Sequence, residues 1–216
     1  MKLGDGVKRQ YQSELRDAQA ATTRRTVIAA AARLFGERGY VATSIDDIAA
    51  AAGVSRATVF TAVGGKPVLL KTALDVAIVG DDEPISLPDR ARSRDVRAEP
   101  DPRRYLALYA GVVTEIGGRA AGIYEAVRGA AGADPGARAL WVEHQAQRRL
   151  GGAHVVSDVL GKSALRPGLN PDRAADIVWA LNDPGLYRVM VHGRGWSPAE
   201  FESWLAETLQ RQLLPD

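Results

Sequence analysis

The chain contains no cysteine among its 216 residues. This absence excludes a disulfide framework, a thiolate zinc site and a catalytic thiol, and nothing indicates an oxidising compartment. Long apolar runs are absent too: no stretch approaches the roughly 18 residues that a membrane span requires, and the N-terminal sequence MKLGDGVKRQYQSELRDAQ has no apolar segment of signal-peptide length. We therefore expect a cytoplasmic protein without a membrane partner.

The chain also lacks a strong net charge, since 28 Lys and Arg oppose 26 Asp and Glu. The distribution is uneven, because residues 1–80 hold 11 of the basic and only 7 of the acidic side chains. A basic excess in the first third is compatible with a nucleic-acid partner, although a solvated surface would have a similar composition. With 46% apolar and 25% charged residues, the composition is that of an ordinary globular protein.

Recognisable catalytic and metal-binding patterns are missing as well. The three histidines, His144, His154 and His192, have no metal-ligand spacing. The GKS triplet at 161–163 has no glycine five residues before Gly161 and no strand ahead of it, so it does not form a phosphate-binding loop. We expect no enzyme activity, no catalytic residues, no metal and no cofactor.

The apolar residues present follow helical spacing, and strand-like alternation does not extend beyond a few residues, so the chain is predicted to be all-α. The first predicted helix, 22–38, stops at Gly39. Thr43 followed by Asp46 predicts the cap of a second helix that ends before Gly53, and Ser55 predicts the cap of a short third helix, 56–63. Pro67 suits the first turn of a fourth helix.

A proline-rich, charged segment, 80–102, separates these helices from the rest and is predicted to be a connector. Beyond it the pattern predicts further helices at roughly 103–116, 119–130, 136–162, 172–182, 184–192 and 198–213.

The stretch AAGVSRATVFTAVGGK, 51–66, indicates what the N-terminal unit does. A helix of about seven residues is unstable alone, but packed behind by two others through Val59 and Val63 it completes a helix-turn-helix. Small side chains at Ala57, Thr58 and Thr61 let such a helix enter the major groove of DNA.

The residues RTVIAAAARLFGERGYVATSIDDIAAAAGVSRATVFTAVGGKPVLL, 25–70, resemble the DNA-binding domain of the TetR family of transcriptional regulators. A weaker resemblance covers 179–209, which are similar to the last helices of many TetR proteins. The resemblance implies a three-helix DNA-binding domain at 21–66 with a linking helix at 67–79. It also implies a larger helical sensor and dimerisation domain at 80–216, and residues 1–20 remain as a basic arm, partly disordered or a helical extension.

The resemblance assigns DNA contacts residue by residue. Thr43 and Ser44 would contact phosphate at the start of the second helix, although both Thr43 and Ser55 also fit a role as helix caps. Lys66 would hold a phosphate after the third helix, and Arg56 could read guanine. The sequence departs from the family pattern at Phe60, Ala62 and Val63, and Phe60 has no hydroxyl to donate. The predicted DNA-binding residues are Thr43, Ser44, Ser55, Arg56, Ala57, Thr58, Phe60, Thr61 and Lys66.

The same resemblance implies a homodimer that binds a pseudo-palindromic operator in double-stranded DNA and, most often in this family, represses until a small molecule releases it. The small-molecule effector is unknown, and its pocket is predicted to involve Tyr105, Tyr109, Tyr124, Trp141 and His144, for which a role in the core is an open alternative. Dimerisation would use 172–192 and 198–213, where Phe201, Trp204, Leu205, Thr208 and Leu209 form a stripe that also suits a monomer core. The competing hypothesis is an all-α small-molecule-binding or docking protein with a degenerate DNA-binding unit.

Overall fold

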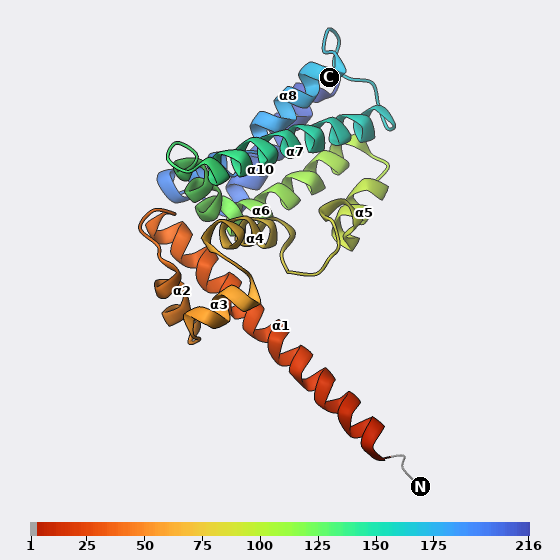
Figure 1. Ribbon diagram of the computed structural model, residues 1–216. Coiled ribbons are helices and arrows are strands. Elements are labelled where there is room, and N and C mark those ends of the chain that lie inside the picture. Colours follow the sequence, from red (N-terminus) through yellow and green to blue (C-terminus); the bar gives the residue numbers. More distant parts are fainter. Residues whose placement is uncertain (1–3) are drawn as a thin grey trace.

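The computed structural model describes the backbone of residues 4–216 and the side chains from residue 15 onward, and within this part the chain is helical without strands. Figure 1 shows a small unit formed by α1 to α3, joined through α4 to a larger helical body. The helices are α1 (Gly4–Arg38), α2 (Ile45–Ala52), α3 (Arg56–Ala62), α4 (Lys66–Val79), α5 (Ala91–Ala98), α6 (Pro102–Ala130), α7 (Pro135–Leu160), α8 (Pro171–Leu181), α9 (Pro184–Tyr187) and α10 (Pro198–Leu213), with a 3-10 turn η1 (Leu87–Asp89) and a π-helical turn η2 (Arg188–Gly193). No helix in the described part is long and apolar enough to span a bilayer.

Helix α1 is longer than the periodicity of its sequence predicts. It starts at Gly4 rather than near Thr22, and its N-terminal part projects away from the body (Figure 1). Residues 15–22 are exposed, whereas the buried positions begin at Val27. A helix segment that packs against nothing has no apolar stripe, so hydrophobic spacing could not indicate it. Residues 1–3 of the predicted arm lie outside the described part.

The helix-turn-helix is fixed by a well-capped α2. Ser44, not Thr43, is the N-cap: its hydroxyl accepts from the backbone N–H of Asp47, and the Asp47 carboxylate accepts from the Ser44 backbone N–H at 2.8 Å. The hydrogen bonds from Ser44 also lower the pKa of the Asp47 carboxyl. Gly53 ends α2 with φ of 67°, a left-handed conformation that favours glycine. The tight turn places α3 against α1 and α2.

Helix α6 is the central element of the larger body and contacts α1, α4, α7, α9 and α10. The two helices predicted at 103–116 and 119–130 are this single helix, which passes through Gly117 and Gly118 without a break. Gly117 serves packing instead of a turn, because a Cβ there would lie 2.6 Å from Cγ of Tyr187. The helix predicted at 184–192 is divided between α9 and the π-helical η2.

Two hydrophobic cores meet along α6. The first joins the N-terminal unit to the C-terminal half of α6 and the start of α7, and includes Phe35, Val59, Leu70 and Tyr124. The second lies between α6, α7, α8 and α10. The unit formed by α1 to α3 is therefore joined to the larger body through the first of these close-packed cores.

Candidate DNA interface and ligand cavity

The exposed face of α3 carries the residues predicted to read DNA. Ser55, Arg56, Ala57, Phe60 and Thr61 are exposed and Thr58 is half-buried. Val59 is fully buried and anchors the helix from behind, while Ser55 caps it by accepting from the N–H of Thr58. This arrangement presents a short helix whose exposed face combines the small side chains of Ala57 and Thr61 with Arg56 and Phe60, which suits insertion into a major groove.

Arg56 and Phe60 lie together on this face. The guanidinium of Arg56 donates to Oδ2 of Asp46 at 2.7 Å and lies 5.6 Å from the centre of the Phe60 ring. The Arg56 and Asp46 side chains are 57% and 67% exposed, and such surface ion pairs contribute about 0–1 kcal/mol. The pair therefore positions Arg56 without preventing it from exchanging Asp46 for a base or a phosphate.

The two hydroxyl residues before α2 lie in different environments. Ser44 is exposed at the start of α2, where it caps the helix. Thr43 is fully buried. Its hydroxyl donates to the carbonyl oxygens of Gly39, at 2.8 Å, and of Leu34, at 3.2 Å. The structure therefore places Thr43 in the joint between α1 and α2, where its hydroxyl cannot reach a phosphate, in contrast to the prediction.

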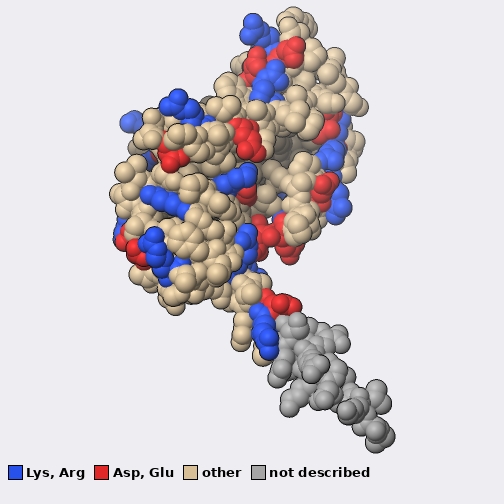
Figure 2. All heavy atoms as spheres, viewed as in Figure 1, with Lys and Arg blue, Asp and Glu red and all other residues tan. Residues whose placement is uncertain are grey.

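Lys66, the first residue of α4, is held in place near this surface. Its Nζ lies 4.3 Å from the centre of the Tyr40 ring and donates to the Val41 carbonyl at 3.5 Å. Partial burial lowers the pKa of its amine. On the face drawn in Figure 2, Lys and Arg are interspersed with Asp and Glu instead of forming one continuous basic patch. Phosphate contacts would therefore depend on individually positioned cations such as Lys66.

The larger body encloses a cavity of about 520 Å³. Its wall is formed by α6 and α7 with the end of α4, η1 and α5 on one side and the α8–α9 junction on the other. Leu87, Val96, Val112, Val113 and Ile116 make much of the wall apolar. A cavity of this size and character is typical of a site for a small organic ligand.

The structure brings three of the five predicted pocket residues to the cavity wall, namely Tyr105, Tyr109 and His144. Tyr124 and Trp141 lie behind the wall in the core shared with the DNA-binding unit, with ring centres 5.1 Å apart. Tyr124 also packs against His144 at 5.6 Å. These two aromatic residues therefore connect the wall to the shared core instead of lining the cavity.

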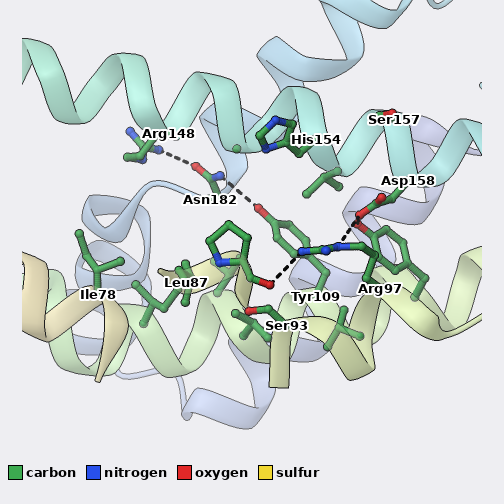
Figure 3. Close-up of a pocket in the computed structure, with 18 of the residues that line it drawn as sticks. Ile78, Leu87, Ser93, Arg97, Tyr109, Arg148, His154, Ser157, Asp158 and Asn182 are labelled. Atoms are coloured by element: carbon green, nitrogen blue, oxygen red, sulfur yellow. Dashed lines mark hydrogen bonds and ion pairs between the residues drawn. The ribbon is translucent and has the colours of Figure 1, made fainter. Parts of the chain in front are cut away.

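One end of the cavity is closed by a buried polar network centred on Arg148, which the sequence analysis did not identify. Arg148 Nη1 donates to Oδ2 of Asp183 at 2.9 Å and to the Tyr124 hydroxyl at 3.0 Å, and Nη2 donates to Oδ1 of Asn182 at 2.9 Å. Asn182 in turn donates to the Tyr109 hydroxyl at 3.1 Å (Figure 3). The residues of this network lie far apart in the sequence, so no local pattern indicates that they meet.

The opposite end is more open and holds a second polar group. Tyr105 donates its hydroxyl to Oδ2 of Asp158 at 3.0 Å, and Arg97 lies 3.9 Å from the same oxygen. Figure 3 shows Arg97 and Asp158 across the cavity from Arg148 and Asn182, with the Tyr109 ring between the two groups. Burial, followed by the Asp158 charge, raises the pKa of the Tyr105 phenol, and burial raises that of Tyr109. Both phenols are protonated at neutral pH.

His144 is buried beside the Arg148 network. Burial, followed by the charge of Arg148, lowers the pKa of its imidazole to about 4, so the ring is neutral at physiological pH. Its Nε2 atom is buried without a hydrogen-bond partner in the described part of the chain. Buried polar atoms are normally paired, so this nitrogen has an unused hydrogen-bonding position.

An exposed short helix behind a tight turn, joined by one shared core to a body with a ligand-sized cavity, defines a helix-turn-helix transcriptional regulator. Residues 27–72 match the family model described as bacterial regulatory proteins, tetR family. The part of the chain from the second half of α1 into α4 is therefore a TetR-family domain. A search of curated protein sequences found no match.

Solved structures show the same fold along most of the chain. A transcriptional regulator from Saccharomonospora viridis in complex with choline is 20% identical, with a TM-score of 0.65 over 88% of this chain and 96% of the other. NalD, the secondary repressor of the MexAB-OprM multidrug efflux pump in Pseudomonas aeruginosa, is 21% identical with a TM-score of 0.67 over 91% and 98%. FadR from Bacillus subtilis in complex with stearoyl-CoA is 16% identical with a TM-score of 0.63 over 85% and 96%.

Proposed function

We propose that the protein is a cytoplasmic repressor that binds a pseudo-palindromic operator as a homodimer and is released when a small molecule fills the cavity. The named similar structures include one repressor and two ligand complexes, with choline and with stearoyl-CoA. For this chain, α3 and its flanking residues Ser44 and Lys66 would contact DNA, and the cavity between α6 and α7 would receive the effector.

The observation that carries this proposal is the position of the end of α4. Ile78 on α4 lines the cavity, and α4 begins at Lys66 beside the DNA-reading surface. Arg119 of α6 donates to the carbonyl oxygens of Ala77 and Ile78 at 3.0 and 3.1 Å, which attaches the end of α4 to the body. A ligand that displaces Ile78 would therefore shift α4 and, through it, the spacing of the two reading heads in a dimer.

The dimer is proposed to form through the outward faces of α8 and α10. Only part of the stripe predicted on the last helix is available for pairing. Phe201, Leu205 and Leu209 are buried within the protomer, whereas Trp204 is half-buried. The pairing surface is therefore expected to use half-buried residues such as Ile177 and Trp204. Sedimentation equilibrium should give the mass of two chains, and a monomer at micromolar concentration would contradict this part of the proposal.

Operator binding is tested by selection from random duplex DNA, followed by gel shift with the selected sequence. We expect a sequence with two inverted half-sites about one helical turn apart and an affinity that falls steeply with salt. If no preferred sequence emerges at low salt, the competing hypothesis of a small-molecule-binding protein with a degenerate DNA-binding unit is favoured.

The coupling role of α4 has its own variant pair. Arg119→Gln removes the attachment between α6 and α4. Arg128→Gln removes an exposed arginine of the same helix whose one ion-pair partner among the described residues is Glu125. We expect Arg119→Gln to change operator affinity by about 1–3 kcal/mol, the usual range of allosteric coupling, and Arg128→Gln to leave it unchanged. Equal effects of the two substitutions would remove the argument for transmission through α4.

A further inference from the structure

The charged side chains on the cavity wall are already paired inside the protein. At the closed end, Arg148 has only 8% of its side chain exposed and is neutralised by Asp183 at 2.9 Å. At the open end, Arg97 lies 3.9 Å from Asp158 and also donates to the Pro88 carbonyl. His144 is neutral, as its lowered pKa requires. Nε of Arg148 is buried without a hydrogen-bond partner, but the charge of this guanidinium is balanced by Asp183. Among the described residues, each arginine and aspartate that lines the cavity therefore already has an ion-pair partner.

A charged ligand would have to separate one of these pairs. An anion bound by Arg148 would leave the Asp183 carboxylate without its cation, and a cation bound at Asp158 would displace both Arg97 and the Tyr105 hydroxyl. Separating the pair at the closed end is strongly unfavourable, because Arg148 is buried and the charge left behind stays desolvated. Arg97 and Asp158 are 47% and 28% exposed, so separating them costs less. The paired wall therefore selects strongly against an anion at Arg148 and more weakly against a cation at Asp158.

Hydrogen-bonding capacity remains at the closed end. The Tyr109 hydroxyl accepts from Asn182, and its own proton has no acceptor among the described residues. Nε2 of His144 also has no partner there. A buried donor without an acceptor costs free energy that a ligand carbonyl or ether oxygen would recover.

We propose that the effector is an uncharged, mainly apolar molecule with a hydrogen-bond acceptor, such as a ketone or ester carbonyl, bound by the Tyr109 hydroxyl. The apolar body of the ligand lies against Val112, Val113 and Ile116, and its acceptor meets Tyr109 next to His144. This inference rests on the proposed function in one respect, since it takes the cavity to be the effector site.

The test uses three probes that have alkyl chains of similar length and differ in their head groups: 2-decanone, decanoate and decyltrimethylammonium. All are used below their critical micelle concentrations. Isothermal titration calorimetry on the full chain gives the three affinities. We expect 2-decanone to bind at least about tenfold more tightly than either ion. Preference for decanoate or decyltrimethylammonium, or no binding of 2-decanone up to its solubility limit, would overturn the proposal.

A pair of variants locates the contact. Tyr109→Phe removes the free hydroxyl and keeps the ring, whereas Tyr105→Phe removes a hydroxyl that is already donated to Asp158. We expect the first substitution to weaken 2-decanone binding about tenfold and the second to leave it nearly unchanged. Equal losses in both variants would show that the acceptor does not meet Tyr109, and would overturn the assignment.

Operator release is measured separately, so that the two proposals fail differently. If decanoate binds and releases the operator, the inferred ligand class is wrong and the proposed function stands. If 2-decanone binds as expected but no bound probe changes operator affinity, the cavity chemistry stands and the proposed release mechanism is wrong.

Discussion

The contact between α1 and α6 at Gly36 and Gly122 provides a direct test of how the DNA-binding unit is attached to the body. A Cβ on Gly122 would lie 3.3 Å from Cα of Gly36, closer than ordinary van der Waals contact and against backbone that cannot rotate away. In Gly122→Ala the two helices must therefore separate by a few tenths of an ångström. Gly129→Ala, later on the same helix, is the matched control, because nothing lies within 4 Å of its added methyl group.

The magnitudes follow from two opposing effects. Replacing glycine by alanine inside a helix stabilises by roughly 0.5–1 kcal/mol, and both variants gain this amount. Overpacking costs typically 1–3 kcal/mol, and only Gly122→Ala has this cost. The control is therefore expected to melt about 1–4 °C above the parent protein, and Gly122→Ala to unfold with about 1–3 kcal/mol less free energy than the control.

The functional readout is operator affinity measured by gel shift or fluorescence anisotropy. Gly122→Ala touches neither the DNA-reading face of α3 nor the cavity, yet it changes how the unit is seated on the body, so we expect its affinity to differ from the parent value. Gly129→Ala should retain the parent affinity. Identical melting temperatures and identical operator affinities for the two variants would refute the view that close contact at Gly36 positions the DNA-binding unit.

Three further predictions concern single residues. Arg56→Ala should cost about 1–3 kcal/mol of operator affinity and relax base preference at one position in a selection assay, whereas a uniform loss over all sequences would indicate a phosphate contact instead. Lys66→Gln should lower the slope of log affinity against log salt by about 1, and an unchanged slope would exclude a phosphate contact. The folded-state pKa of His144, about 4, is below its ordinary 6.5, so its contribution to stability is present above that ordinary value and is lost as pH falls. Urea unfolding should show a loss on the order of 2 kcal/mol between about pH 7 and about pH 5 that His144→Gln lacks.

The sequence predicted those helices whose capping and apolar spacing lie within a few residues. The helix-turn-helix was predictable because Gly53, Ser55 and Val59 each act locally. The cap of α2 was predicted one residue too early, since Thr43 and Ser44 are both good cap residues and only the structure shows that Thr43 lies in the core. Local signals establish that a helix begins, whereas the packing of α1 against α2 decides which hydroxyl caps it.

Glycine was a misleading signal in α6. A Gly-Gly pair at 117–118 normally indicates a break, and the prediction ended one helix there. In the structure Gly117 makes room for the Tyr187 ring, which is 70 residues away in the sequence. A glycine required for close approach and a glycine required for a turn are identical in sequence, and only the tertiary contact distinguishes them.

The candidate cavity was only partly predictable for the same reason. Aromatic residues on the expected helices indicated Tyr105, Tyr109 and His144, which do line the wall. Arg148 and Asn182 were missed, because a single arginine among surface-like charges carries no sign that its partners Tyr124, Asn182 and Asp183 lie 24, 34 and 35 residues away. Their pairing is a property of three helices together, and no local pattern encodes it.

Tyr124 shows how the cavity and the DNA-binding unit are physically continuous. Its ring is buried in the core that also contains Phe35 and Leu70, whereas its hydroxyl donates to Asp183 and accepts from Arg148 at the closed end of the cavity. A ligand that accepts the free proton of Tyr109 would be linked through Asn182 and Arg148 to Tyr124, which lies within a core that includes α1. The same side chain thus belongs to the hydrogen-bond network that would sense a ligand and to the packing that holds the reading head. Because a close-packed core transmits small displacements instead of absorbing them, this double membership would give the proposed effector a second route to the helix-turn-helix, besides the proposed route through the end of α4.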